Sequence, residues 1–303
     1  MRTKENKNSY IMLVSSLIIV GTIGVFRRHI PLSSALIAFF RGIIGSATLF
    51  VFVKLRKSEG WKSVGAKTLA GLAASGAFIG INWILLFEAY NYTTVAKATL
   101  CYYMQPTIVL LLSPLVLKEK LTAKKIACAL VALAGMIFVS GVIGEDAKQA
   151  GDFKGVLLGL GAACFYALVI ILNKKIAGVG TYQKTIVQLA SAALVLVPYL
   201  AVAGDFKGID FSARLVFLLL IVGIVHTGFA YVLYFGSMDG LKAQTVSALS
   251  YIDPVVAMIA SALVLGERMT VWGVIGAVMI IGSAVVSELE PPFAFLARKR
   301  SMR

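Results

Sequence analysis

The chain has 303 residues, of which 59% are hydrophobic and only 14% charged, and its mean hydropathy is +0.89. Soluble domains carry about a quarter charged residues, so the composition indicates that lipid is the main solvent of this chain. Ten spans of about 20 apolar residues would fill most of the sequence, which leaves no room for a separate soluble catalytic domain.

Apolar runs of helical length follow one another along the whole sequence. They predict ten membrane-spanning helices over residues 10–26, 32–53, 68–90, 94–117, 123–141, 154–172, 182–203, 214–236, 243–265 and 271–287. The expected fold is therefore an all-α polytopic membrane protein. Three cysteines, Cys101, Cys128 and Cys164, lie inside these runs without paired spacing, so neither a disulfide framework nor a zinc site is expected.

The formal net charge of +15 comes mostly from short basic clusters between the apolar runs. With a cytoplasmic N-terminus, twenty lysines and arginines fall on the cytoplasmic side and seven on the outer side. This bias predicts a multi-pass protein of the inner membrane with both termini in the cytoplasm. The positive charge then faces anionic lipid headgroups, and nucleic acid is not an expected partner.

An internal repeat relates the two halves of the sequence. A shift of 148 residues aligns residues 103–122 with residues 251–270, and eight of the twenty aligned positions are identical. The expected units are a five-helix repeat at 1–143, a second at 152–288, and a basic cytoplasmic tail at 289–303. Because five is odd, the second repeat must enter the membrane inverted, as secondary transporters arrange their repeats around a site at the midplane.

The paired segments resemble the EamA-type members of the drug/metabolite transporter superfamily, as do residues 85–89 leading into 92–96. The resemblance covers nearly the whole chain. It implies ten helices in two EamA repeats and a transporter of small metabolites, often an exporter of amino acids or related compounds. It also implies a cavity built from the first, third, fourth, sixth, eighth and ninth spans. It names no substrate.

Pro106 and Pro254 fall at equivalent places in the fourth and ninth spans. Each removes a backbone donor inside the membrane, which is tolerated where the helix is buried in protein or lines a wet cavity. The functional interpretation is a pair of kinks beside the substrate path, and the structural one is a static kink that shapes packing.

Arg41, His226 and Asp253 lie about half way through their spans, where a charge needs a partner or a wet cavity. Arg41 could meet a substrate carboxylate, and Asp253 and His226 could carry a proton in a proton-coupled mechanism. The alternative is a structural ion pair or hydrogen bond. The resemblance favours a structural role for Arg41, because many family members carry an arginine in this helix.

Glu88 and Lys97 flank a tight connection between the third and fourth spans, so a salt bridge between them is the first expectation. The alternative is a site for an organic cation, because a carboxylate near aromatic faces attracts one. The aromatic residues near Glu88 are Trp83, Tyr90, Tyr92, Tyr102 and Tyr103. The candidate substrate-binding residues also include Asn82 and Gln105, as hydrogen-bonding groups, and Tyr231 in the eighth span.

Other motifs favour packing and capping. Gly76 with Gly80, and Gly155 with Gly159, are pairs of small residues four apart that permit close helix approach. Thr122 and Thr270 each follow a glutamate by three residues and are expected to cap the next helix.

No phosphate-binding loop and no metal-binding cluster of histidines is present in the sequence, so we expect no cofactor and no enzyme activity. The principal hypothesis is a secondary transporter that moves small metabolites by alternating access, with export of amino acids or related metabolites as the expected activity. The alternatives are a carrier of organic cations or drugs and, remotely, a membrane-embedded enzyme acting on lipid, for which no nucleophile and base are adjacent in sequence.

Overall fold

The computed structural model describes residues 4–56, 64–93, 95–139, 152–176, 178–203, 206, 209–266 and 270–288. In this part of the chain every regular element is a helix. The helices are α1 (Lys4–Gly21), α2 (Ile23–Arg27), α3 (Ser34–Arg56), α4 (Ala66–Tyr92), α5 (Val95–Tyr102), α6 (Gln105–Leu117), α7 (Ala123–Val139), α8 (Asp152–Lys175), α9 (Thr181–Ala203), α10 (Ala213–Gly223), the π-helix η1 (Ile224–Phe229), α11 (Ala230–Ser237), α12 (Ala243–Ser250), α13 (Ile252–Leu265) and α14 (Val271–Glu288).

Eight helical stretches of the described chain are long and apolar enough to cross a membrane, and Val271–Ser287 is a shorter apolar helix. Large apolar side chains cover the outward surfaces: Leu115, Val202 and Leu263 are 81%, 92% and 80% exposed. Water would disfavour so many exposed apolar groups, whereas lipid tails would not. The predicted all-helical, multi-pass membrane protein is therefore confirmed.

Two of the spans are broken into half-helices at equivalent places. α5 ends at Tyr102 and α6 begins at Gln105, while α12 ends at Ser250 and α13 begins at Ile252. Pro106 and Pro254 lie in the first turn of α6 and of α13, where a helical N–H has no intrahelical partner. Each proline therefore starts a half-helix instead of interrupting a continuous one.

Small residues let the central helices approach closely. A Cβ on Gly80 of α4 would lie 2.7 Å from the carbonyl oxygen of Ala192 in α9, and one on Gly159 of α8 would lie 2.9 Å from Cβ of Cys101 in α5. Both distances are shorter than real Cβ contacts. The two glycine pairs thus form the close contacts expected from their spacing.

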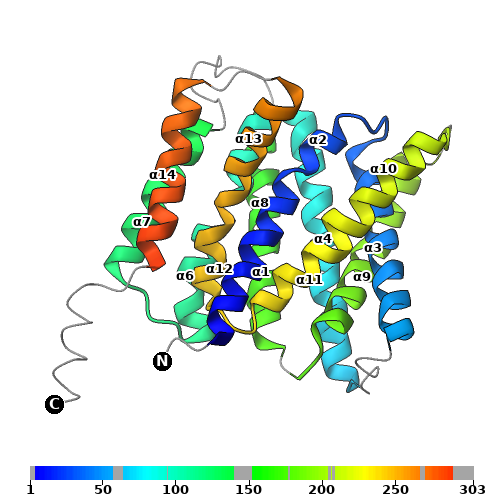
Figure 1. The fold of residues 1–303 in the computed structure, drawn as a ribbon, viewed down its shortest axis with the longest axis horizontal. Coiled ribbons are helices and arrows are strands. Elements are labelled where there is room, and N and C mark those ends of the chain that lie inside the picture. The colour runs from blue at the N-terminus through cyan, green and yellow to red at the C-terminus, as the bar shows by residue number, and fades with distance from the viewer. Residues whose placement is uncertain are drawn as a thin grey trace.

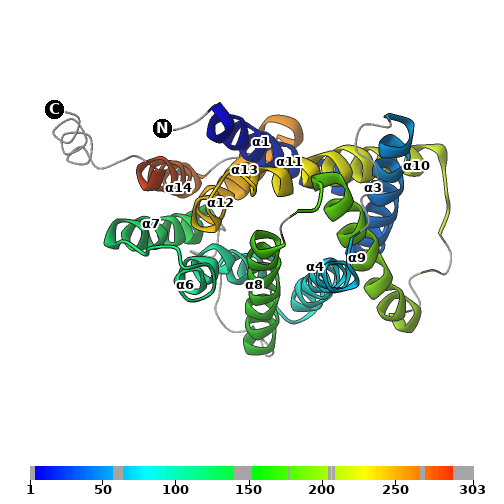
Figure 2. The same cartoon turned by 90° about the horizontal axis from the view of Figure 1, so that it is seen from below.

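The arrangement gives the molecule two long sides and two ends. α1, α11 and α13 lie along one long side and α6, α8 and α4 along the other, with the pair α7 and α14 at one end (Figure 2). α12 begins, and α14 ends, on the side of the molecule where α1 begins, at the bottom of Figure 1. We call this the N-terminal side, and the other the opposite side.

Candidate functional site

A cavity of about 660 Å³ lies between the two long sides and is large enough for a small metabolite. Its lining comes from α1, α2, α3, α4, α5, α8, α10, α11, α12 and α13, with Gln105 from the start of α6. Arg27, Ser34 and Tyr90 extend the lining towards the helix ends of the opposite side. The cavity therefore reaches that side.

Two opposite charges line this cavity without pairing to one another. The guanidinium carbon of Arg41 lies 5.0 Å from the ring centroid of Trp83, and Nε of Arg41 is buried with no hydrogen-bond partner in the described part of the chain. Across the cavity lining, the Tyr103 hydroxyl donates to Oδ2 of Asp253 at 3.0 Å. Among the described residues neither charge has an ion-pair partner within 4.0 Å. A cation and an anion thus remain open to a ligand.

Tyrosine rings form much of the wall around these charges. The ring centroids of Tyr102 and Tyr103 are 5.5 Å apart, those of Tyr102 and Tyr166 are 6.0 Å apart, and those of Tyr166 and Tyr234 are 6.5 Å apart. Tyr231 also lines the cavity, close enough to Arg41 for electrostatic interaction. Such a wall offers apolar faces and hydroxyl groups together.

Gln105 adds an unusual polar group to the lining. It is 3% exposed, and its Nε2 has no hydrogen-bond partner among the residues that the structure describes. A buried amide without a partner is unfavourable, so such a group calls for an explanation.

Seven of the ten predicted binding residues line the cavity: Arg41, Trp83, Tyr102, Tyr103, Gln105, Tyr231 and Asp253. The lining, as far as the structure describes it, does not include the other three, Asn82, Glu88 and His226. Whether any of them contacts a substrate stays a prediction.

The other three hold helices together. Asn82 of α4 donates to the carbonyl oxygen of Ala162 in α8 at 2.7 Å. Nε2 of His226 in η1 lies 3.1 Å from Oγ1 of Thr22, at the break between α1 and α2. These contacts join separate helices inside the membrane, where polar side chains often have this role.

Glu88 has two hydrogen-bond partners among the described residues, and its expected salt bridge with Lys97 stays a prediction. Its Oε1 accepts from the Tyr199 hydroxyl at 2.6 Å, and its Oε2 accepts from Asn91 at 3.3 Å. The ring of Tyr92, expected near a bound cation, is covered by Nζ of Lys154 at 3.8 Å from its centroid. The side chain of Lys97 lies outside the described residues. Glu88 therefore joins α4 to α9.

Sequence reasoning missed two tyrosines of the cavity lining, Tyr166 and Tyr234. Tyr166 is the single tyrosine of α8, and Tyr234 follows Tyr231 in the apolar α11. A helix in lipid shows no clear polar face that would mark either residue. Only the packing of α8 against the α11–α12 region brings their rings together.

On the N-terminal side, polar groups bind the half-helices together. Oε1 and Oε2 of Glu119 accept from the backbone N–H groups of Ala243 and Gln244 at 2.9 and 3.2 Å. These are the first residues of α12, so the carboxylate caps this half-helix. Ser247 donates to the carbonyl oxygen of Pro106 at 3.0 Å, which ties α12 to α6.

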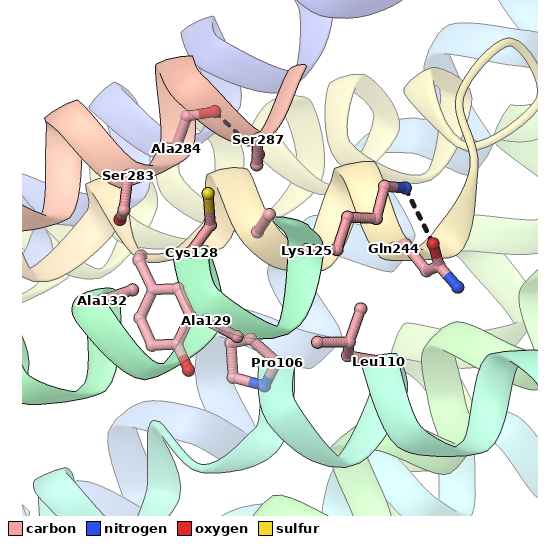
Figure 3. A pocket seen from close by; sticks show the side chains of 12 residues that line it. Pro106, Leu110, Lys125, Cys128, Ala129, Ala132, Gln244, Ser283, Ala284 and Ser287 are labelled. Carbon is pink, nitrogen blue, oxygen red and sulfur yellow. Dashed lines mark hydrogen bonds between the residues drawn. The ribbon is translucent and has the colours of Figure 1, made fainter. Parts of the chain in front are cut away.

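Gln244 connects three helices on the same side. Its Oε1 accepts from Nζ of Lys125 at 2.7 Å, a contact drawn in Figure 3, and its Nε2 donates to Ser113 at 2.7 Å. The neighbouring pocket has a volume of only about 20 Å³, room for about one water molecule. The space beside these contacts is therefore too small for a metabolite.

Thr122 and Thr270 cap the helices that follow them, as expected. Oγ1 of Thr122 accepts from the backbone N–H of Lys125 at 3.3 Å, and Oγ1 of Thr270 accepts from that of Gly273 at 3.0 Å.

In the part of the chain that the structure describes, no three histidine, cysteine or acidic side chains lie together in a way that could hold a metal ion.

Comparisons with known proteins agree with this architecture. A solved crystal structure superposes with a TM-score of 0.80 at 20% identity, covering 95% of this chain and 99% of that one, which shows the fold. An uncharacterized transporter of Bacillus subtilis, YxxF, is 29% identical over 290 residues, 94% of this chain and 91% of its own. One from Clostridium kluyveri is 27% identical over 296 residues, 93% of each chain. The profile of the EamA-like transporter family matches residues 7–141 and again residues 153–288, so the chain belongs to that family.

Proposed function

We propose that this protein is a secondary transporter that exports small zwitterionic metabolites, such as amino acids, across the cytoplasmic membrane. Membership of a transporter family supports transport. The zwitterionic cargo is supported by Arg41 and Asp253, which line one cavity without forming an ion pair. A carboxylate and an ammonium on one small molecule would neutralise both charges. Because water is scarce at such a site, both attractions are strong.

The proposed mechanism is alternating access by two inverted repeats, 1–143 and 152–288, that together span the membrane ten times. The matching half-helix breaks before Pro106 and Pro254 support this assignment, since discontinuous helices commonly meet at the binding site of such carriers. A cavity that reaches one side while polar contacts close the other corresponds to one of the two access states.

The test is uptake of radiolabelled amino acids by proteoliposomes, with and without an imposed pH gradient, which also examines the proton as coupling ion. Arg41→Gln and Asp253→Asn should each lower the transport rate by roughly tenfold to a hundredfold, as expected from losing a buried hydrogen bond to a charged group. Lys154→Gln and Glu88→Gln are matched controls, because they remove a cation and an anion outside the cavity lining. Equal losses in the controls would contradict the proposal.

The second candidate cargo is an organic cation, favoured by the tyrosine wall beside Asp253. Under this alternative Asp253→Asn abolishes transport of quaternary ammonium compounds, while Arg41→Gln leaves it intact or improves it. Loss of Glu88 would also abolish that transport if Glu88 belonged to the cation site. Competition by tetraalkylammonium ions against the labelled amino acid separates the two cargo classes.

The proposed orientation places both termini and the N-terminal side in the cytoplasm. The loop that contains Lys148 would then be external; it lies outside the described residues. A cysteine introduced at Lys148, in a background without the native cysteines, should react with an impermeant thiol reagent in intact cells. Protection at Lys148 together with labelling of a cysteine at Lys124 would show that the orientation is the opposite of the one proposed.

A further inference from the structure

The two broken helices are joined by hydrogen bonds that follow the sequence repeat. Tyr103, just after α5, donates to Asp253 in α13, and the hydroxyl of Tyr251, just after α12, lies 3.1 Å from that of Thr107 in α6. The 148-residue shift places Tyr103 on Tyr251 and Gln105 on Asp253. The two tyrosines are thus equivalent in sequence but have different partners and surroundings.

Their surroundings differ because only one side of the molecule is open. Tyr103 lines the large cavity, whereas Tyr251 is 1% exposed and packs in the core formed by α7, α13 and α14. In a carrier built from inverted repeats, the second access state is reached when each repeat adopts the conformation of the other. Each contact of the present state then maps onto a counterpart shifted by 148 residues.

Applied to Tyr103 and Asp253, this mapping gives Tyr251 and Gln105. Nε2 of Gln105 is a buried donor without a partner among the described residues, so the group that the mapping selects is one that lacks a hydrogen bond in the present state. We propose that Gln105 donates to the Tyr251 hydroxyl in the alternate conformation, where this pair replaces Tyr103 and Asp253 in the wall of the binding site. The inference rests on the proposed function.

A second contact supports the same exchange. Ser247 donates to the carbonyl oxygen of Pro106 on the closed side, and the mapping turns this pair into Thr99 and Pro254. Thr99 also carries a hydroxyl, and it lines the cavity on the side that would then close. In both versions of this contact, a residue with a hydroxyl group therefore faces a proline.

The exchange is not symmetric in energy. The present contact between Tyr251 and Thr107 would map onto Tyr103 and Val255, and a valine side chain accepts no hydrogen bond. Tyr103 thus gives up its bond to Asp253 without an equivalent replacement. Without cargo, the balance of these hydrogen bonds favours the conformation seen here.

The experiment measures the two conformations without any cargo. Met238 corresponds to Tyr90 of the cavity lining and is 2% exposed, so a cysteine there should react with a maleimide only in the alternate conformation. The full-length protein is purified with Cys101, Cys128 and Cys164 replaced, reconstituted in nanodiscs, and its rate of labelling at Met238→Cys is recorded.

Two variants should move this rate in opposite directions. Ser247→Ala removes a contact of the present state and should raise the rate roughly threefold, as expected for one interhelical hydrogen bond in a membrane. Gln105→Leu removes a contact of the alternate state and should lower it roughly threefold. Tyr251→Phe loses one bond in each state and should leave the rate near that of the parent.

A double variant identifies the partner of Gln105. Removing a buried, unpaired amide could favour the present state by itself, and that effect would persist without the Tyr251 hydroxyl. If the two groups pair in the alternate conformation, Gln105→Leu should have no further effect in the Tyr251→Phe background. An undiminished effect there would overturn the proposal, as would a faster or unchanged rate for Gln105→Leu alone.

Folding and function are checked separately. Thermal melting verifies that each variant is folded, and Gln105→Met provides a second substitution of similar length. Amino-acid flux is measured in proteoliposomes from the same preparations. Absence of flux in the parent would refute the proposed function while the labelling results still test the pairing; labelling at Met238→Cys that no variant changes would refute the pairing even with normal flux.

Discussion

The two sides of the cavity are built in different ways. On the N-terminal side, side chains of one helix bind the backbone or polar groups of another: Glu119 caps α12, Ser247 reaches Pro106, and Gln244 joins Lys125 to Ser113. On the opposite side the cavity lining continues to Arg27 and Tyr90. The difference teaches that a few contacts at the ends of half-helices, rather than the apolar packing of whole spans, decide where the cavity opens.

Among the variants that compare the two sides of the cavity, the largest effect is expected from removing the Glu119 cap. Glu119→Ala leaves two backbone N–H groups of α12 without their acceptor, and a lost cap costs about 0.5–2 kcal/mol. We expect a lower melting temperature and faster labelling of a cysteine at Met238, because the closed side is weakened. The exposed Asp210 provides the control: if Asp210→Ala destabilises the protein as much, the loss is not specific to the cap.

A smaller effect is expected from the prolines. Pro106→Ala and Pro254→Ala each allow an N–H in the first turn of a half-helix and favour fusion with the half-helix before it. Transport should fall several-fold while protein abundance changes little, as measured by flux per amount of reconstituted protein. Parental rates in both variants would show that the prolines only shape packing.

The smallest effect is expected at Glu88, on the opposite side. Tyr199→Phe removes the hydroxyl that donates to Glu88 and should cost about 0.5–1.5 kcal/mol of stability. Because this bond joins α4 to α9 without crossing the described cavity lining, flux per folded protein should not change. A loss of flux without a loss of stability would bring Glu88 back among the substrate-binding residues.

The helical class could be predicted because lipid requires long apolar runs whose backbone is satisfied internally, and such runs are visible in the sequence. Pro106 and Pro254 indicated roughly where the two helices are broken, because a proline alters the backbone of its own helical turn. The ten-span count and the inverted repeats stay predictions, supported by the 148-residue repeat.

The site was harder to predict because polar groups in lipid look alike in sequence. Asn82 and Gln105 are both amides in apolar spans, yet Asn82 binds a carbonyl group of α8 and Gln105 lines the cavity. Likewise one of the partners of Glu88 is Tyr199, 111 residues away, which no local pattern in the sequence indicates. Which helix faces a polar side chain is decided by packing between distant spans.

The π-helix η1 has a consequence for how such a wall can change during evolution. The hydroxyl of Thr227 in η1 donates to the carbonyl oxygen of Val222, five residues earlier, at 2.9 Å. A π-turn holds one residue more than an α-turn, and one residue corresponds to about 100° of rotation in an α-helix. Because the π-turn absorbs that extra residue, deleting it would leave a regular α-turn with α11 at nearly its present rotation. Deleting a residue from a regular α-turn would instead rotate α11 and carry Tyr231 and Tyr234 away from the cavity. The chain can thus lose one residue at η1 and keep both wall residues in place, which the regular α-helical turns beside it do not allow.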